Sequence, residues 1–484
     1  MYFLKVIFLF LLLQINASTS LFAQKNQSIL TKKYAPKLLK EDSKVLKEVM
    51  LAMHPAIGLY YPRTFYQSYF DNYINQLKDS LTEKQYRISL KTLLDVLHCG
   101  HTEVGLSNNS FKAIKKLKLN YSPLVFLPLN GKVYFIASTE KKWDTLIKKV
   151  SQIIAINGVL TDSMQSQIPR LISGDGYNTS GKQHYLSLAF NSYFPAIYSR
   201  PDTFEVEYKS GKEIKKIKYP AFKTQSFPPI PLGGRDTLFR TYRKAGIKTK
   251  FLDQGNTTLL LKIEKFSHLK YSKAYRKIFR EAKYRQVQNL IIDLRNNGGG
   301  SLANSYKLLA YLLDTSLTQT LKTGISNYPY RKYTSGNFWF KITKLGFKLV
   351  GKKLVVSDTD NYVYTIRPHQ KYHYHKKIIV LINGGSFSAS CLVSAYLKYK
   401  NRAIFIGEET GGALEGCNAG VTPYYTLPNT KVKIRVPAFR IIHDVSPAIT
   451  GRGIMPDYKI EYTIKDIFAK RDLELMKAME LLGL

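Results

Sequence analysis

From residue 257 onward the chain alternates short apolar runs with helical segments, and this alternation limits the possible folds more than any other feature. Four apolar runs are expected to be buried strands: Leu259 to Ile263, Leu290 to Leu294, Ile378 to Ile382 and Ile404 to Ile406. Three segments between them have the pattern of helices: residues 271–284, 302–313 and 389–399. Such alternation predicts an α/β core with parallel strands.

The residues before this core divide into regions of different character. Residues 24–115 carry apolar residues at helical spacing and are expected to be mostly helical. Residues 116–222 contain strand-like runs separated by turns such as Asn157-Gly158, which predicts a small mixed domain. Residues 223–256 are punctuated by proline and glycine and read as a connector, so the third domain is taken as residues 223–484.

The first residues have the composition of a targeting signal. Lys5 precedes an unbroken apolar run from Val6 to Leu13, and Ala23 is suited to precede a cleavage site. A run this short cannot span a bilayer as a helix, which favours a cleaved signal peptide over residues 1–23 rather than a retained anchor. No later stretch is apolar enough to span, so the mature chain is expected to be exported, periplasmic or extracellular, and without a transmembrane span.

The chain is strongly basic, because 73 Lys and Arg against 34 Asp and Glu give a formal net charge of +39. A charge of this size suits a nucleic acid or an anionic membrane surface. The basic residues are scattered and no nucleic-acid-binding motif accompanies them, so no nucleic-acid partner is expected. We interpret the charge as a general surface property that favours contact with anionic envelope components.

Cysteine and histidine give little indication of a disulfide framework or a metal site. The three cysteines are too few for such a framework, and burial as small packing residues is favoured over a single bridge: Cys99, Cys391 and Cys417. Three histidines cluster in HQKYHYH: His369, His373 and His375. Paired histidines can bind zinc, but no cysteine or acidic ligand stands beside them, so a solvated strand is favoured and no metal is expected.

Two glycine-rich turns follow predicted buried strands and precede predicted helices. In Asn296 to Gly300, three consecutive glycines let the backbone approach a ligand closely and present N–H groups to an anion. In Asn383 to Ser390 (NGGSFSAS), a serine stands at the positive end of a helix, where developing negative charge is stabilised. Either turn alone has a plainer interpretation, a tight turn in the first case and a helix cap in the second.

Together with three further segments, these turns resemble peptidase family S41, which includes the C-terminal processing proteases and the tricorn core protease. Five segments occur in the family's order: LLLKIEKF at 259–266, DLRNNGGG at 293–300, NGGSFSAS at 383–390, GEETGG at 407–412 and GIMPD at 453–457. The resemblance covers residues 257–465 and implies a crotonase-like α/β core. Residues 116–222 look like a PDZ-type module on the weaker match of QIIAING at 152–158.

The resemblance implies a serine peptidase that works through an acyl-enzyme. In the family the nucleophile is the serine that falls at Ser388. The oxyanion donors are the N–H of the next residue, Ala389, and a glycine N–H of the glycine-rich turn, Gly298 or Gly299. No cofactor is implied, and the expected partners are peptide or protein substrates.

The chain departs from the processing proteases at the general base. Their lysine lies 25 residues after the serine, and Ala413 occupies that position here. Lys398 and Lys400 lie nearer in sequence but read as solvated residues of the following helix. The tricorn-like branch instead uses a histidine from an N-terminal segment, and His101, in LHCGHT at 97–102, resembles that element. A neutral imidazole can take a proton from a serine hydroxyl near neutral pH.

His101 is expected just past the end of a helix, with Gly100 in the left-handed C-cap position. The alternative for His101 is a capping or packing role, and His98, one helical step away, reads as structural. The orienting acid has no direct counterpart. In the tricorn-like pattern a glutamate lies three residues before the glycine matched by Gly453, and Thr450 stands there. The nearest acids are Glu408 and Glu409, of which Glu409 is taken as the third catalytic residue.

Other functions fit part of this pattern. A catalytically weak or inactive peptide-binding protein of the same fold is compatible with the missing lysine and the missing glutamate. An acyl-CoA enzyme of the crotonase type is disfavoured by the export signal, because acyl-CoA chemistry is normally intracellular. His443 with Asp444 offers a second base and acid, less favoured than His101.

Overall fold

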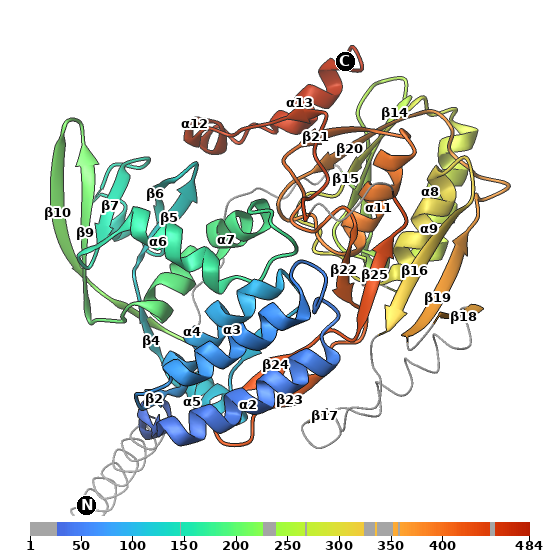
Figure 1. Ribbon diagram of the computed structural model, residues 1–484. Coiled ribbons are helices and arrows are strands. Elements are labelled where there is room, and N and C mark those ends of the chain that lie inside the picture. The colour runs from blue at the N-terminus through green and yellow to red at the C-terminus, as the bar shows by residue number, and fades with distance from the viewer. Residues whose placement is uncertain are drawn as a thin grey trace, which may run out of the picture.

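The computed structural model describes residues 27–145, 147–225, 239–266, 269–323, 334–335, 352–356, 359–445 and 451–484. Three parts meet around a common centre: a helical N-terminal part, a mixed module and a larger α/β domain (Figure 1). The expected signal peptide, residues 1–23, lies outside the described residues. Among the helices that are described, none is both long enough and apolar enough to cross a bilayer.

The α/β domain is built on a mainly parallel sheet whose inner strands are the apolar runs predicted from the sequence. Its described strands lie in the order β12-β13-β14-β15-β20-β21-β26. Their bounds are Arg240–Tyr242, Ile247–Phe251, Thr258–Ile263, Asn289–Asp293, Lys377–Ile382, Ile404–Gly407 and Tyr458–Lys459. The pairings from β14 to β26 are parallel, whereas β12 and β13 extend one edge antiparallel. The prediction of parallel strands is confirmed, and residues 240–251 of the expected connector belong to the sheet.

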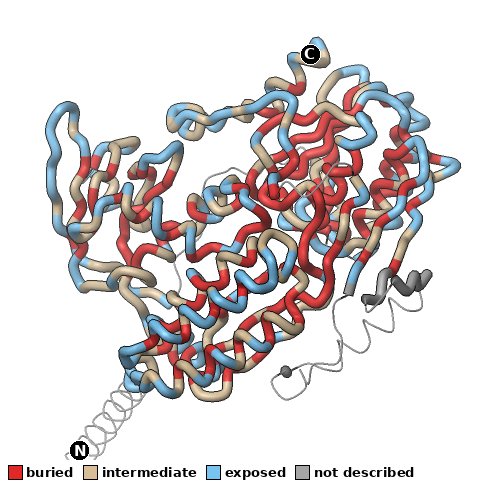
Figure 2. Tube along the Cα trace, in the orientation of Figure 1, coloured by how far each residue is buried: buried red, intermediate tan, exposed pale blue. Residues whose placement is uncertain are grey.

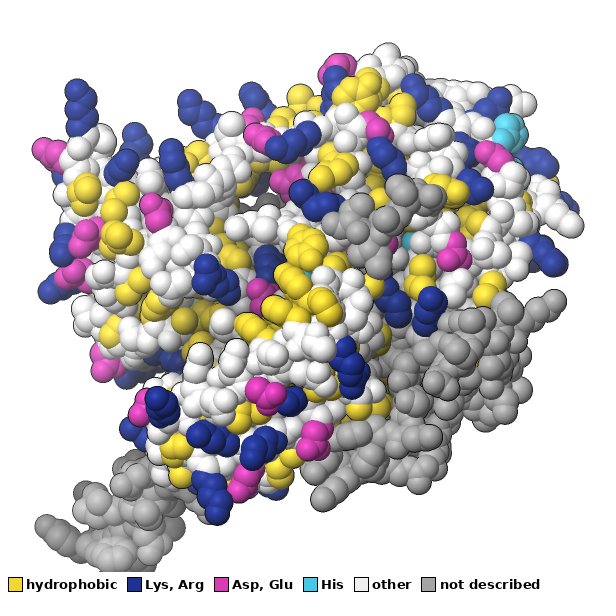
Figure 3. Space-filling view, in the orientation of Figure 1, with side chains coloured by type: hydrophobic (Ala, Val, Ile, Leu, Met, Phe, Trp, Pro, Cys, Tyr) yellow, Lys and Arg dark blue, Asp and Glu magenta, His cyan; other side chains and the backbone are white. Residues whose placement is uncertain are grey.

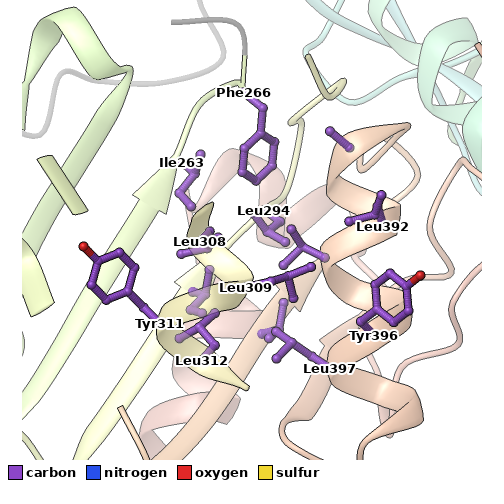
Figure 4. Packing of buried hydrophobic residues seen from close by; sticks show 14 of the residues in the cluster. Ile263, Phe266, Leu294, Leu308, Leu309, Tyr311, Leu312, Leu392, Tyr396 and Leu397 are labelled. Carbon is purple, nitrogen blue, oxygen red and sulfur yellow. The ribbon is translucent and has the colours of Figure 1, made fainter. Parts of the chain in front are cut away.

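Side chains alternate between the two faces of this sheet, because successive residues of a strand point in opposite directions. One face is covered by three helices: α8 (Tyr271–Tyr284), α9 (Leu302–Leu312) and α11 (Ala389–Tyr399). Figure 4 shows Leu308, Leu309 and Leu312 of α9 in one apolar cluster with Leu392 and Leu397 of α11. The other face packs against α13 (Leu473–Glu480). The inner strands β14, β15, β20 and β21 are almost entirely buried (Figure 2), so the turns at their ends rest on a rigid base.

The N-terminal part contains, after a helical turn at residues 27–31, the helices α2 (Pro36–Met53), α3 (Arg63–Gln76), α4 (Glu83–Leu94) and α5 (Asn108–Lys116). Thr82 and Gln85 form a reciprocal capping box that begins α4. The apolar faces of α2, α3 and α4 share one core with the hairpin β23 (Tyr424–Thr426) and β24 (Lys433–Arg435) of the α/β domain. In addition, β3 (Glu103–Gly105) pairs antiparallel with β24, so the segment that carries His101 is joined to the α/β domain by a core and a strand pairing.

The mixed module is an antiparallel sheet with helices on one side. Its main strands, in the order β10-β9-β7-β6-β5, are Glu213–Pro220, Thr203–Ser210, Gln152–Ile156, Lys132–Ser138 and Leu124–Leu129, and β8 (Val159–Leu160) pairs with β7. The helices are α6 (Thr161–Gln167) and α7 (Ser180–Ile197). At its other side the sheet contacts Ile464 and Ile467 of α12 (Ile464–Phe468). A PDZ-type module remains a prediction.

The edges of this module are protected against strand addition. β7, on which the PDZ-type resemblance rests, is an inner strand paired with β6 and β9. At edge strand β5 the Asn191 side chain of α7 bonds both backbone groups of Phe126, with Nδ2 donating to O and Oδ1 accepting from N–H, each at 2.8 Å. The opposite edge strand, β10, carries several lysines, which disfavour edge-to-edge pairing.

The remaining strands form smaller sheets. The order β18-β19-β16-β25-β22 comprises Lys352–Val356, Thr359–Ile366, Leu317–Thr323, Phe439–His443 and Gly416–Ala419. β17 (Thr334–Ser335) joins β23, β24 and β3. Two short pairs complete the described strands: β1 (Lys33–Tyr34) with β2 (Leu81–Thr82), and β4 (Leu119–Tyr121) with β11 (Phe222–Thr224). Lysine and arginine side chains are spread over all three parts of the face seen in Figure 3.

Candidate active site

Ser388 stands in a strained turn between β20 and α11. Its φ of 57° and ψ of −117° are unusual for a residue with a side chain. Such conformations cost about 1–3 kcal/mol and gather at functional sites. The Ser388 hydroxyl does not cap α11, and it forms no hydrogen bond with the described residues. The plainer interpretation of this serine as a helix cap therefore does not hold.

The two neighbouring serines have structural contacts. Ser386 Oγ donates to Leu294 O at 2.8 Å, and Ser390 Oγ donates to Asn297 O at 2.8 Å. Both are fully buried, whereas Ser388 is partly accessible. Of the three serines in this turn, Ser388 has the hydroxyl that is available for chemistry.

Asparagine side chains join the two glycine-rich turns. Asn383 and Asn296 exchange two hydrogen bonds of 2.9 Å, from the Asn296 backbone N–H to Asn383 Oδ1 and from Asn383 Nδ2 to Asn296 Oδ1. Asn297 is fully buried, and its Nδ2 donates to Ile263 O at 2.8 Å. Its backbone O accepts from Phe387 N–H at 3.0 Å. The segment DLRNNGGG is thus held directly against the turn that carries Ser388.

We expect Asn297→Ala to lower the free energy of unfolding by about 2–3 kcal/mol, because Ile263 O and Gly299 N–H lose their partner in a buried place. Urea denaturation followed by circular dichroism measures this change. The matched variant Asn383→Ala removes hydrogen bonds at a more accessible position, where water can replace them, and should cost about 1 kcal/mol. Equal losses for the two variants would contradict the role given to Asn297.

Gly299 of the first turn lies against the turn that carries Ser388. A Cβ on Gly299 would lie 2.7 Å from both Phe387 O and Ser388 Cβ, so no side chain fits there. Gly299 N–H already donates to Asn297 Oδ1 at 2.9 Å. Gly298 N–H has no acceptor among the described residues, and Ala389 N–H belongs to the unpaired first turn of α11. Two backbone donors beside Ser388, those of Gly298 and Ala389, are therefore available to a ligand.

The structure brings His101 to the same place. A 3₁₀ turn (Asp95–Leu97) follows α4, and His98, with φ 47°, takes the left-handed position that was predicted for Gly100. Gly100 lies instead against Phe387, since a Cβ there would lie 2.5 Å from Phe387 Cζ. The His101 ring packs on the Phe387 ring with 4.9 Å between centroids. His101 therefore contacts the residue that precedes Ser388, although the two segments are far apart in sequence.

The environment of His101 keeps its imidazole neutral. Burial, and secondarily the positive charge of Arg435, lower the pKa of His101 to about 4. Arg435 Nε donates to His101 O at 3.1 Å, which fixes the backbone here. Nδ1 is buried and has no partner among the described residues, while Nε2 is not buried. A neutral ring with one accessible nitrogen can accept a proton at neutral pH.

The other predicted acid and base candidates are engaged elsewhere. Glu409 binds Arg452 Nε at 2.9 Å and Arg452 Nη2 at 2.6 Å, and it accepts from Gly453 N–H at 2.7 Å. Lys398 pairs with Asp457, and Ala413 is buried. Within the described residues no hydrogen bond or ion pair joins Glu409 to His101.

Of the other histidines singled out from the sequence, His443 and His373 bind neighbouring residues. His443 is buried, and its Nδ1 bonds Leu414 O at 2.7 Å, while Asp444 accepts from Thr320 Oγ1 at 3.1 Å. His373 pairs with Asp314 at 3.3 Å. No group of three potential metal ligands occurs within the ranges described. The three cysteines are buried and unbridged: Cys99, Cys391 and Cys417.

Asp175 belongs to this centre and was missed by the sequence reasoning. It is 2% exposed, and its Oδ1 accepts from Gly100 N–H at 2.7 Å. Burial raises the pKa of Asp175 to about 7, the Gly100 N–H and Arg440 lower it, and Glu415 raises it. The available sequence signal was an acid between two glycines, Gly174-Asp175-Gly176, in a loop between predicted elements.

A cavity of about 260 Å³ opens beside these residues. Phe387, Gly411 and Gly100 line it on the side of Ser388 and His101. The mixed module contributes four apolar or aromatic side chains to its lining: Leu171, Ile172, Tyr185 and Tyr193. Charged side chains of Lys91, Glu103 and Arg435 line it as well. The cavity therefore extends from the module to Gly100 and Phe387, the residues that precede His101 and Ser388.

Comparisons with known proteins agree with this fold. The model of peptidase family S41 matches residues 257–460. The crystal structure of mature CPAF superposes with a TM-score of 0.63 at 15% identity, covering 91% of this chain and 96% of that one. Mature CPAF complexed with lactacystin gives a TM-score of 0.63 at 15% identity, with 93% and 98% covered. At this identity the likeness shows a shared fold.

A curated protein of Chlamydia pneumoniae, CPj1016/CpB1054, is 28% identical over 117 residues. The match covers 24% of this chain and 18% of that protein. The chain thus matches less than a fifth of the length of this relative.

Proposed function

The chain belongs to peptidase family S41 through residues 257–460, and on this premise we propose that it cleaves peptide bonds with Ser388 as nucleophile and His101 as general base. His101 Nε2 takes the proton of Ser388 Oγ while Oγ attacks the substrate carbonyl carbon. The N–H groups of Ala389 and Gly298 stabilise the oxyanion, Gly299 being the less suited donor because its N–H is occupied. His101 then gives the proton to the leaving amine, the C–N bond breaks, and water releases the acyl group by the reverse sequence.

One observation carries this proposal: an unpaired serine stands in a strained strand-to-helix turn, and a neutral histidine from a distant segment packs on Phe387, the residue before the serine. A helix cap or a packing serine needs neither the strain nor the histidine. The buried contacts of Ser386 and Ser390 support Ser388 as the reactive member of the turn. The proposed substrates are peptides or proteins, and no cofactor takes part in these steps.

A fluorophosphonate probe tests the proposal directly, because only an activated serine reacts with it. We expect stoichiometric labelling, and the modified tryptic peptide should contain Ser388. Protein that is denatured before treatment with the probe should not be labelled. Folded protein that neither labels nor hydrolyses a casein-type substrate would favour the alternative, an inactive peptide-binding protein of the same fold. The proposal includes export of the protein, with residues 1–23 as the signal peptide. Determining the first residue of the mature protein tests this part of the proposal.

We further propose that the 260 Å³ cavity receives a large apolar side chain of the substrate. Tyr185→Ala should raise KM about tenfold for peptides with a bulky apolar residue next to the scissile bond, with kcat little changed, because ground-state contacts are lost. Steady-state kinetics on paired peptides, bulky against glycine at that position, measure the effect. The matched control is Tyr399→Ala, a tyrosine of similar exposure at the end of α11, which should leave both constants unchanged. Identical KM shifts on both peptides would rule out this use of the cavity.

A further inference from the structure

The centre around His101 contains buried polar atoms that have no hydrogen-bond partner among the described residues. They come from four segments of the chain: His101 Nδ1, Asp175 Oδ2, Glu415 Oε2 and Asn418 Oδ1. A buried polar atom without a partner costs about 1–3 kcal/mol, and native proteins keep few of them. Three of these atoms belong to titratable groups, one imidazole and two carboxyl groups. Titratable atoms without hydrogen-bond partners in one region indicate a site that can take up and release protons.

The backbone that carries Asp175 is tightly held. Gly176 N–H donates to His98 O at 3.0 Å, and Tyr177 N–H donates to Gly451 O at 2.6 Å. Gly176 has φ 64°, and a Cβ there would lie 2.1 Å from Gly451 O, so the loop requires glycine at this position. The carboxyl group is thus aimed by a rigid loop and by contacts to two distant segments.

Asp175 lies between the His101 segment and the helix that follows Ser388. The position of a Cβ on Gly100 would be 3.3 Å from Asp175 Oδ1 and 2.5 Å from Phe387 Cζ, so carboxylate and phenyl ring lie on the same side of Gly100. The same phenyl ring packs on His101. Burial raises the pKa of Cys99 and of Cys391 in α11, and the charge of Asp175 adds to both effects.

We propose that Asp175 is the positioning residue for His101. Its Oδ1 fixes the backbone at Gly100. Its Oδ2 and His101 Nδ1 both lack a partner among the residues that the structure describes, and a turn of the imidazole toward the carboxylate lets Oδ2 accept Nδ1–H, which holds the tautomer with a lone pair on Nε2. The proposal rests on the proposed function. When Nε2 takes the Ser388 proton, the imidazolium forms next to a carboxylate in a buried place, where the attraction is strong. When Nε2 releases the proton to the leaving amine, the ring returns to the same tautomer.

Other charged groups at this centre shift the pKa values of His101 and Asp175. Arg435 of β24 lowers the pKa of His101, and Arg440 of β25 favours the ionised form of Asp175. Glu415 opposes that ionisation, and its Oε1 accepts from Gly451 N–H at 3.0 Å. The other titratable groups near Asp175 are held neutral by desolvation: His98, Cys99, Cys391, Cys417, Tyr60 and Tyr185. Asp175 is the carboxyl group bonded directly to the peptide next to His101.

The variant Asp175→Asn separates charge from shape. Its Oδ1 can still accept from Gly100 N–H, but an NH₂ group replaces Oδ2 and would donate to Nδ1, which places the proton on Nε2. We expect kcat to fall about 10²–10⁴-fold with KM within threefold, because the wrong tautomer cannot take the serine proton. The rise of activity with pH that accompanies ionisation of Asp175 should also disappear. Asp175→Glu should restore part of the activity.

A measurement that does not need catalysis keeps this inference separate from the proposed function. The ¹⁵N shifts of the His101 ring at pH 8 should show the Nδ1–H tautomer in the parent and the Nε2–H tautomer in Asp175→Asn. Asp314→Asn, an exposed carboxylate, is the control for both measurements. An unchanged tautomer, or a loss of activity in Glu409→Gln or Glu415→Gln without one in Asp175→Asn, would overturn the assignment. A parent protein that has the expected tautomer but never labels with fluorophosphonate would contradict the function alone.

Discussion

Ser388→Ala is expected to lower peptide hydrolysis by roughly 10⁴–10⁶-fold and to abolish fluorophosphonate labelling. The mutation removes the attacking oxygen but no contact, since the Ser388 hydroxyl has no hydrogen-bond partner in the described structure. The unfolding midpoint should therefore stay within a few degrees of the parent. Activity, labelling and thermal unfolding are measured on the same preparations.

The two neighbouring serines provide the matched controls. Ser386→Ala and Ser390→Ala each remove a buried hydrogen bond of 2.8 Å and should lower stability by about 1 kcal/mol while keeping most of the activity. The opposite pattern, in which either control is inactive and Ser388→Ala remains active, would assign the nucleophile to a different serine.

His101→Ala is expected to lower kcat about 10³–10⁵-fold, because the serine proton loses its acceptor. In the parent, kcat/KM should fall in two steps as the pH falls: first through about 7, where Asp175 takes up a proton, and then through about 4, the value to which burial and Arg435 lower the pKa of His101. Below that second pH the imidazole is protonated and cannot act as a base. A pH profile of kcat/KM between pH 3.5 and 9, corrected for unfolding at low pH, measures both steps.

His98→Ala is the control for this variant. His98 packs among Tyr60, Tyr61 and Tyr177 and takes a left-handed backbone position, so its loss should affect stability more than proton transfer. If His101→Ala remains active and Lys398→Ala is inactive, the general base is a lysine, as in the processing proteases, and not His101.

The sequence was sufficient where short-range patterns carry the information. The strands β14, β15, β20 and β21 are runs of apolar residues between helices of ordinary length, and local composition determines both. The turn around Ser388 was found because its glycines and serines lie together in sequence. These features need no knowledge of what packs against them.

Features that depend on distant contacts were missed or misplaced. Gly100 was expected to end a helix, but its lack of a side chain serves the close approach of Phe387, almost 290 positions away. Glu409 was chosen by its nearness in sequence, whereas Arg452 engages its carboxylate. Asp175 joins the centre through a hydrogen bond to Gly100, and no local pattern encodes that pairing. Charge partners of this kind become visible when the chain is folded.

The pairing of β3 with β24 has a consequence for the newly made protein. A nascent chain that has emerged as far as residue 400 already contains His101, Asp175 and Ser388, but it lacks the strand Lys433–Arg435 to which the histidine segment is bound. Arg435, which holds the His101 carbonyl, is also still missing. The three groups thus meet late in synthesis, and an unfinished or truncated polypeptide carries no assembled centre. The order in which the segments are synthesised therefore delays assembly of the proposed active site. This delay does not require a separate propeptide.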